Sequence, residues 1–273
     1  MRAFVKFLLS LIIFIPMFCG CGYHQKSTLE ACKIQGDIAT LYDTVWSADF
    51  YMGKVRLLYI SDISVRHFNE DGFLLSQVVY NYYGDITKKE EWTYKNRQLC
   101  GFKNFDGKGQ LKSSTRYDNE NGLVKKDLTE FFGTEEKQDP VQTFYYYTKD
   151  RLDSLISRQG GKNKRIVYEY LDRNNSYRET TTDYSGLTSS ITVWIDGQAN
   201  MYKQAAGLDT FYLQYDTIGN VSEFKTKQST TLFKYKYDEH KNWVEQVHYQ
   251  QLSENEDPVV KMVVKRGIVY REC

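Results

Sequence analysis

The stretch FKYKYDEHKNWVEQVHY, from Phe233 to Tyr249, shows how this chain is built. Aromatic residues alternate with lysines, a short polar segment follows, and a second alternating stretch comes after it. Side chains on a β-strand point alternately to opposite faces, so Tyr235 shares a face with Phe233 while Lys234 and Lys236 occupy the other. The stretch therefore predicts two antiparallel strands joined by a tight turn, with one packed face and one wetter face.

The same plan recurs along most of the chain. An aromatic residue ends a strand, Asp or Asn opens the turn, Gly or Asn closes it, and a hydrophobic residue starts the next strand. The Asx side chain can bond the backbone two residues on, and Gly or Asn tolerates the positive φ that such turns need. Turns follow one another at about 12 residues or twice that, as in hairpin-connected strands. The predicted turn residues of four units are Asp106, Gly109, Asp118, Gly122, Asp216, Gly219, Asn220, Asp238 and Asn242.

The composition predicts an all-β fold. Among 273 residues, 23 are Tyr and only 3 are Pro, and Tyr packs its ring in strands while its hydroxyl stays wet. We expect a single curved antiparallel meander of roughly twelve to eighteen strands, because sheets of more than about ten strands curl or close. The last stretch, from Val259 to Tyr270, is predicted to be a final hairpin around Arg266 and Gly267. The sequence leaves open whether the sheet closes.

The charge balance and the absence of motifs exclude several function classes. Lys and Arg total 36 against 35 for Asp and Glu, and a net charge of only +1 argues against nucleic acid as the main partner. The chain has no nucleophile elbow, phosphate-binding loop, dinucleotide fingerprint or H-E-x-x-H zinc motif. Its acidic pairs are adjacent in sequence, which on a strand points them to opposite faces. We therefore expect no enzyme activity, no cofactor and no metal site.

The first residues differ from the rest. Arg2 and Lys6 precede an apolar run from Phe7 to Phe18, which is too short to span a bilayer of about 30 Å but fits a secretory signal. The following Gly20-Cys21 resembles the lipobox of bacterial lipoproteins, with Phe18 and Cys19 as departures from its usual residues.

This resemblance implies a signal peptide over 1–20, a lipidated Cys21, a tether over 21–34 and a β-repeat domain over 35–273. Two or more acyl chains anchor a protein stably where one does not. Gly22 replaces the aspartate that signals retention in the inner membrane in such proteins, so the resemblance implies the outer membrane, on its periplasmic or its outer side.

Three cysteines remain after the anchor, namely Cys32, Cys100 and Cys273. An exported chain can form disulfides, and a bridge from Cys32 to Cys273 would tie its two ends together. An odd number leaves at least one thiol over, and three free thiols are an equal alternative.

The repeated unit is similar to that of the YD-repeat family, also called Rhs-type repeats, whose pattern is Tyr-Asp-x-x-Gly followed by Asn or Arg. The stretch Tyr215–Asn220 matches every defined position, and Tyr237–Asn242 matches with Lys241 in place of Gly. The resemblance covers roughly residues 60 to 250 and implies a β-meander. In large members the meander encloses a toxin; this chain is too short for such a shell, so the resemblance implies the fold and not toxin delivery.

Exposed aromatic residues are the candidate binding surface. Rings on a strand can serve as cross-strand packing or as a platform for sugar rings or a partner's side chains. The candidate residues are Trp92, Trp194, Trp243, Tyr82 and Tyr146.

Three functions are considered. The first is a membrane-anchored, non-enzymatic lipoprotein of the bacterial cell envelope that binds or scaffolds another envelope protein. The second is a glycan-binding surface lipoprotein that uses exposed tryptophans, and the third is a hydrolase without a visible site. The second requires solvent-exposed tryptophans in a line.

Overall fold

The computed structural model describes residues 27–271 except 33, 134–137, 150, 172–175, 196–197, 205–209 and 254. The signal sequence, Cys21 and Cys273 lie outside these residues. Within this described part of the chain, the short helix α2 (Thr28–Ala31) precedes the sheet. The strands are β1 (Ile38–Tyr51), β2 (Lys54–Phe68), β3 (Leu74–Asn81), β4 (Ile86–Lys95), β5 (Gln98–Asp106), β6 (Leu111–Glu120), β7 (Leu123–Phe131), β8 (Val141–Thr148), β9 (Arg151–Gln159), β10 (Lys162–Tyr170), β11 (Tyr177–Thr182), β12 (Thr188–Ile195), β13 (Gln198–Gln204), β14 (Thr210–Tyr215), β15 (Val221–Lys225), β16 (Thr230–Tyr237), β17 (Trp243–Gln251) and β18 (Val259–Tyr270).

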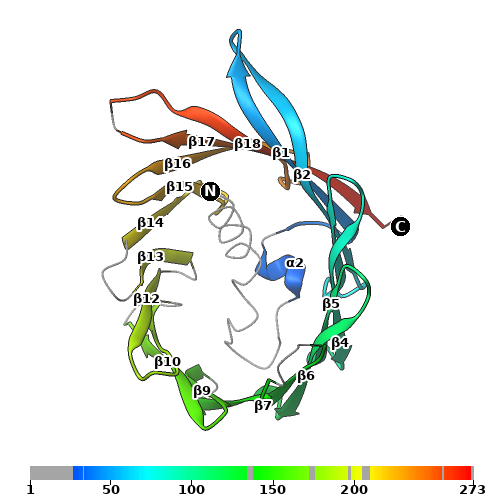
Figure 1. The fold of residues 1–273 in the computed structure, drawn as a ribbon, viewed down its shortest axis with the longest axis vertical. Coiled ribbons are helices and arrows are strands. Elements are labelled where there is room, and N and C mark those ends of the chain that lie inside the picture. Colours follow the sequence, from blue (N-terminus) through cyan, green and yellow to red (C-terminus); the bar gives the residue numbers. More distant parts are fainter. Residues whose placement is uncertain are drawn as a thin grey trace.

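The strands form one 18-stranded antiparallel sheet, which confirms the predicted all-β meander. Each strand pairs with the next along the chain, and β1 also pairs with β18 from Ile38 to Ser47. The sheet therefore curls into a ring, seen end-on in Figure 1. An 18-stranded antiparallel sheet has strong cumulative twist, and joining its first and last strands removes both long open edges.

Six of the turns share one hydrogen-bond pattern. The backbone N–H of the first residue donates to the carbonyl four residues on, and its own carbonyl accepts from the N–H three residues on. Its side-chain oxygen accepts a third bond from the N–H four residues on. These first residues are Asn69, Asn81, Asp106, Asp183, Asp216 and Asp238.

The unit around Asp118 is different, and here the predicted turn needs correction. Asp118 lies inside β6 and forms an exposed ion pair with Lys126, 3.2 Å away. The chain reverses at Asn121 and Gly122, whose φ values of 52° and 80° are those of a two-residue hairpin turn. The same sequence pattern, an aromatic residue, Asp and then Gly, therefore occurs in two turn types. At Asn121 and Gly122 the Asn-Gly pair favours the shorter, two-residue turn.

Two further differences concern β1, β2 and β18. The expected hairpin at Arg266 and Gly267 does not exist, because β18 runs straight through them. Gly267 pairs with Tyr42 of β1, and pairing along the strand outweighs a local turn preference. A turn that was not predicted from the sequence, at Met52 and Gly53, joins the two longest strands into a hairpin.

Residues of the repeat also form hydrogen bonds between successive hairpins. The Tyr237 hydroxyl donates to Asp216 of the preceding turn at 2.5 Å and accepts from the Asn220 amide at 3.0 Å. Tyr270 makes the same pair of bonds, with Asp238 at 2.7 Å and Asn242 at 3.0 Å. The Tyr, Asp and Asn positions of the pattern therefore meet between successive hairpins rather than within one.

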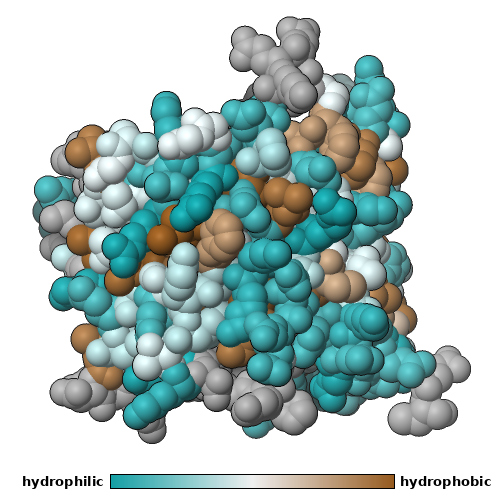
Figure 2. Space-filling model, turned by 90° about the horizontal axis from the view of Figure 1, so that it is seen from below, coloured by the Kyte–Doolittle hydropathy of each residue, from teal (hydrophilic) through white to brown (hydrophobic). Residues whose placement is uncertain are grey.

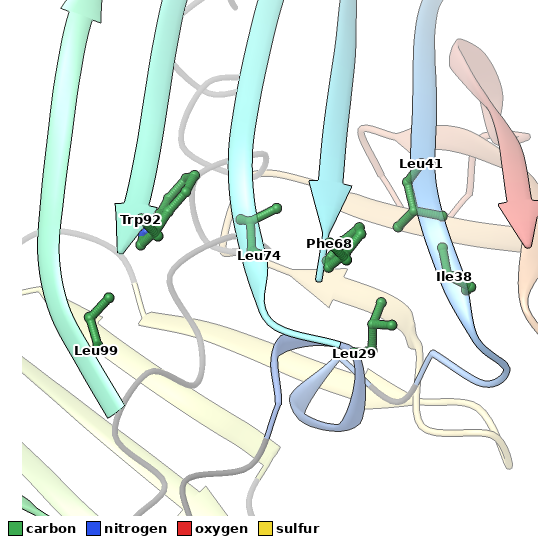
Figure 3. Close-up of a cluster of buried hydrophobic side chains, with 7 residues drawn as sticks. All are labelled: Leu29, Ile38, Leu41, Phe68, Leu74, Trp92 and Leu99. Carbon is green, nitrogen blue, oxygen red and sulfur yellow. The ribbon is translucent and has the colours of Figure 1, made fainter. Parts of the chain in front are cut away.

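The two faces of the ring differ in polarity. Leu29 of α2 lies inside the ring, in one hydrophobic cluster with Leu41, Leu74 and Trp92, so these strand residues face inward (Figure 1, Figure 3). By the strand alternation their neighbours face outward.

On the outer face, charged residues pair across or along strands. These pairs include Lys89–Glu91, Arg116–Glu130, Glu169–Arg178 and Lys236–Glu245. Figure 2 shows a mainly hydrophilic wall with hydrophobic groups interspersed. The part of the outer wall seen in Figure 2 is therefore suited to contact with water.

The N-terminal segment, residues 27–37, is folded onto one rim of the ring. The Leu29 N–H donates to the Gly72 carbonyl at 3.1 Å, and the Leu74 N–H donates to the Thr28 hydroxyl at 3.0 Å. Ser27 and Glu30 form a reciprocal capping box at the start of α2. This rim, which carries the start of β1, the end of β18 and the β2–β3 and β16–β17 turns, is called the N-terminal rim below. The predicted tether is thus folded from Ser27 onward.

Candidate binding surfaces

The inner wall next to the N-terminal segment carries a buried charge cluster. Asp43 on β1 is 4% exposed and lies between Arg266 of β18 and Arg66 of β2. The Arg266 Nε and Nη2 atoms donate to the two Asp43 oxygens at 2.7 and 2.8 Å. Burial alone would raise the pKa of Asp43, but the two guanidinium groups outweigh it and lower that pKa. Arg266 in turn lies over the Trp243 ring, 3.5 Å from its centroid.

A row of polar side chains continues from this cluster across four strands. Arg66, Gln77, Glu90 and Asn104 are direct cross-strand partners on β2 to β5, so they share the inner face. Arg66 Nε, Gln77 Oε1 and Asn104 Oδ1 are buried without a protein partner among the described residues. An 18-stranded ring is wider than its own side chains can fill, so a polar inner wall is compatible with hydration.

The three tryptophans do not form an exposed line. Trp92 and Trp194 are each 9% exposed and lie in separate hydrophobic clusters on β4 and β12. Trp243 is half-buried beneath Arg266. All three face inward by register, so the ring does not offer their faces for stacking from outside.

The two candidate tyrosines are exposed but separate. Tyr82 lies in the β3–β4 turn beside Tyr83, with ring centroids 3.5 Å apart. Tyr146 lies on β8, four strands away from β4. The structure therefore does not bring the five predicted aromatic residues into one surface, and the glycan hypothesis loses the exposed tryptophans it required.

The thiols and the buried histidine show no reactive arrangement. Cys32 and Cys100 are free thiols, and Cys273 lies outside the residues that the structure describes. Surrounding protein atoms desolvate the Cys32 thiol and raise its pKa, against the opposing effect of Arg66 and Arg266. Burial lowers the pKa of His248 to about 3, so its ring is neutral.

Within the described residues, no three His, Cys, Asp or Glu side chains are placed to hold a metal ion. In the same part of the chain, no helix has the length and apolar character needed to cross a membrane.

The most exposed apolar surface lies on an element that sequence reasoning missed. Residues 48–61, the outer part of the β1–β2 hairpin, project beyond the ring (Figure 1). This projecting hairpin carries Met52, 83% exposed, and Tyr59, 62% exposed. Its other exposed apolar residues are Phe50, Tyr51, Val55 and Leu58. The Met52-Gly53 pair between two apolar runs is the signal that could have revealed it.

No protein-family model and no curated protein matches this chain. A crystal structure of a porin-like protein from Bacteroides uniformis is similar in fold, with a TM-score of 0.44 and 9% identity over 85% of this chain and 96% of that chain. The crystal structure of TcdB2-TccC3-Cdc42 aligns with a TM-score of 0.33 and 12% identity over 74% of this chain, which spans 14% of that chain. No family is shown. Values this low do not transfer a function.

Proposed function

We propose that this protein is a non-enzymatic β-repeat lipoprotein of the bacterial cell envelope, anchored in the outer membrane through Cys21, that binds another envelope component. The observation that carries the proposal is the docking of residues 27–37 onto the N-terminal rim. Only five residues lie between Cys21 and Ser27, and the six steps of chain between these two residues span at most about 20 Å. The acyl chains would therefore hold the ring close to the membrane by this rim.

The outer wall supports an anchor rather than insertion. The pairs Lys236–Glu245 and Arg116–Glu130 lie on the outer face, where a wall in contact with lipid would need apolar residues. A lipid-facing Lys or Arg at the bilayer midplane destabilises a membrane-spanning barrel by about 2–4 kcal/mol. Each of these two pairs contains one such cation. The wall is expected to remain in water.

The turn geometry supports the proposed relation to YD-repeat proteins. Asp216, Asn220 and Tyr237 occupy the defined positions of the family pattern, and the structure links them by hydrogen bonds between hairpins. The same residue types therefore have a structural role here, which explains their recurrence without any catalytic use. The proposal of a binding role without catalysis agrees with two observations. The His248 ring is neutral, and both carboxylate oxygens of Asp43 already accept hydrogen bonds from Arg266.

The anchor is tested by Cys21→Ala in the full chain. The variant is expected to remain unlipidated and to leave the membrane fraction, while the wild type stays in it. Metabolic labelling with a radioactive fatty acid provides the direct readout of acylation. Cys32→Ala is the matched control, since this thiol lies in the folded part and should leave both membrane fractionation and labelling unchanged. Normal membrane fractionation of the Cys21→Ala variant would exclude the anchoring proposal.

A further inference from the structure

The projecting hairpin, residues 48–61, has an unpaired edge. Pairing of β1 with β18 ends at Ser47, and pairing of β2 with β3 begins at Asp62. Among the described residues, no strand pairs with the β3-facing edge of β2 from Lys54 to Ser61. An open strand edge presents unpaired N–H and C=O groups to any extended chain, and a two-stranded ribbon alone is only marginally stable.

One face of this hairpin is apolar and continues onto the ring. Ala48 packs with Val260 and Val263, and Leu57 and Trp46 pack against the same cluster. Further out, the paired residues Phe50 and Val55 extend this face and are exposed, at 60% and 37%. The hairpin is therefore held firmly at its base, while its outer half exposes apolar side chains that would bury area against a partner.

The charges on the hairpin select between possible partners. Arg56 is paired with Asp49, its Nε donating to Oδ1 at 3.0 Å, and Lys54 is exposed with no ion pair among the described residues. The hairpin thus has one more cation than anion. Two copies of this chain meeting edge to edge would bring two positive excesses together, and edge lysines are a common guard against such self-pairing. An acidic strand meets no such repulsion.

The position of the hairpin argues against the anchoring membrane as its ligand. β1 starts at the N-terminal rim, and its 14 residues extend about 45 Å to the tip. The five-residue link from Cys21 to Ser27 holds the opposite rim near the lipid. The tip therefore points away from the membrane that holds the protein.

We infer that the open edge of β2, residues 54–61, docks an extended segment of another envelope protein that carries apolar and acidic residues, by strand addition. Strand addition combines backbone hydrogen bonds for affinity with alternate side chains for specificity. Apolar side chains of the partner cover Phe50 and Val55, and an acidic side chain of the partner pairs with Lys54. This inference names the partner class for the proposed function and rests on it.

Photo-crosslinking in intact membranes tests the inference. The full chain, with Cys21 intact, carries p-benzoylphenylalanine in place of Tyr59 on the open edge. The matched control carries it in place of Tyr212, which is 52% exposed on β14, away from the hairpin. A discrete adduct with another protein at position 59, absent at position 212, is the expected result. Lys54→Glu should lower the adduct yield about fivefold, and Lys54→Arg should preserve it.

Four outcomes overturn the inference. They are an adduct of twice the chain mass, which means self-association; adducts with lipid; the same pattern at both positions; and no adduct at position 59. An unchanged yield in Lys54→Glu overturns the acidic character of the partner. Loss of the protein from the membrane fraction would instead overturn the proposed anchor, so the two failures are distinguishable.

Discussion

Asp43 illustrates at the residue scale how a buried charge is tolerated in the ring wall. It is 4% exposed, and its two oxygens accept bonds from Arg266 and Arg66 on the neighbouring strands. A carboxylate removed from water is stable only when its partners replace the lost hydration. Because its partners come from β2 and β18, this one residue links the two strands on either side of β1.

Asp43→Asn is expected to lower the free energy of unfolding by about 3–5 kcal/mol, because it leaves two cations at the site without their counter-charge. Urea denaturation gives the value from the shift in midpoint at unchanged slope. Asp49→Asn is the control on the same strand, since Asp49 forms a solvent-exposed pair with Arg56 and its loss should change stability little. Equal effects of the two variants would contradict the buried role of Asp43.

The same residue predicts a pH dependence. The folded pKa of Asp43 is lowered below an unfolded value of about 3.9, so the unfolded chain binds its proton first as the pH falls. The stabilisation from Asp43 is complete above that unfolded value and is lost as the pH falls through the lowered folded pKa. The stability gap between wild type and Asp43→Asn should therefore narrow below about pH 4. A constant gap in acid titrations of both proteins would contradict this.

A second prediction at this scale concerns the Asx turns. Asp216→Ala removes the acceptor for the N–H groups of Ile218, Gly219 and Asn220 and for the Tyr237 hydroxyl. A loss of about 1–2 kcal/mol is expected, as for other side chains that satisfy backbone donors. Thermal and urea unfolding measure it.

The control for Asp216 is Asp118→Ala. Asp118 has the same sequence context, but it lies in a strand and makes only an exposed pair with Lys126. Its replacement should have little effect on unfolding, and a loss as large as that of Asp216→Ala would show that the two turns are alike after all.

At the scale of the element, the N-terminal segment depends on the ring for its structure. A four-residue helix such as α2 is far below the length that is stable alone in water. Its capping box and the packing of Leu29 against Leu41 and Phe68 hold it instead (Figure 3). The segment is thus a separate element that can be displaced without unfolding the sheet.

Gly72→Ala is expected to displace this segment. Gly72 has a φ of 78°, and an added Cβ would lie 3.0 Å from Ser27 Oγ and 3.3 Å from Leu29 Cδ1. Gly84→Ala is the matched control, because it has the same turn type and a φ of 86° but no atom within 4 Å of the added Cβ. Both variants carry the backbone strain of about 1 kcal/mol.

Only Gly72→Ala should speed hydrogen exchange at the Leu29 amide, whose acceptor is the Gly72 carbonyl. Exchange measured by mass spectrometry on the peptide that contains residues 27–37 gives the readout. Equal protection in both variants would mean that the segment does not rely on this contact.

At the scale of the whole molecule, closure of the ring rests on one long-range pairing. β1 and β18 are separated by most of the chain, and their residues from Ile38 to Ser47 pair with Met262 to Tyr270. Bringing distant segments together costs loop-closure entropy that grows only slowly with length. The hydrogen bonds and side-chain contacts of the pairing offset that entropy, and the two ends of the sheet cover each other.

An engineered disulfide tests closure. In a background with Cys32, Cys100 and Cys273 replaced by serine, Thr44→Cys with Lys265→Cys places two thiols at directly paired positions. Opposite Cβ atoms in such a pair are about 4.5–5.5 Å apart, so mild oxidation should cross-link them. Tyr42→Cys with Lys265→Cys is two residues out of register and should not cross-link. Non-reducing electrophoresis separates the two results, and equal reactivity would mean an open or sliding seam.

Much of the fold could be predicted from sequence because it depends on local periodicity. Alternation placed Phe233 on the packed face and Lys234 on the wet one, and the structure agrees. Asx and Gly marked most turns because they act within five residues of chain. Prediction failed at Asp118, where the local sequence pattern fits two turn types. It also failed at Gly267, where pairing with the distant strand β1 keeps the chain extended instead of turning.

Local periodicity is enough to show that this chain is a meander of hairpins with alternating faces. The pairing of β1 with β18, the inward position of Trp92 and Trp194, and the projection of residues 48–61 from the ring depend on long-range contacts. The physical reason is that a period of two says which residues share a face but not which face becomes the inside. That choice is made when the sheet curls and closes, through contacts between residues that are far apart in the sequence.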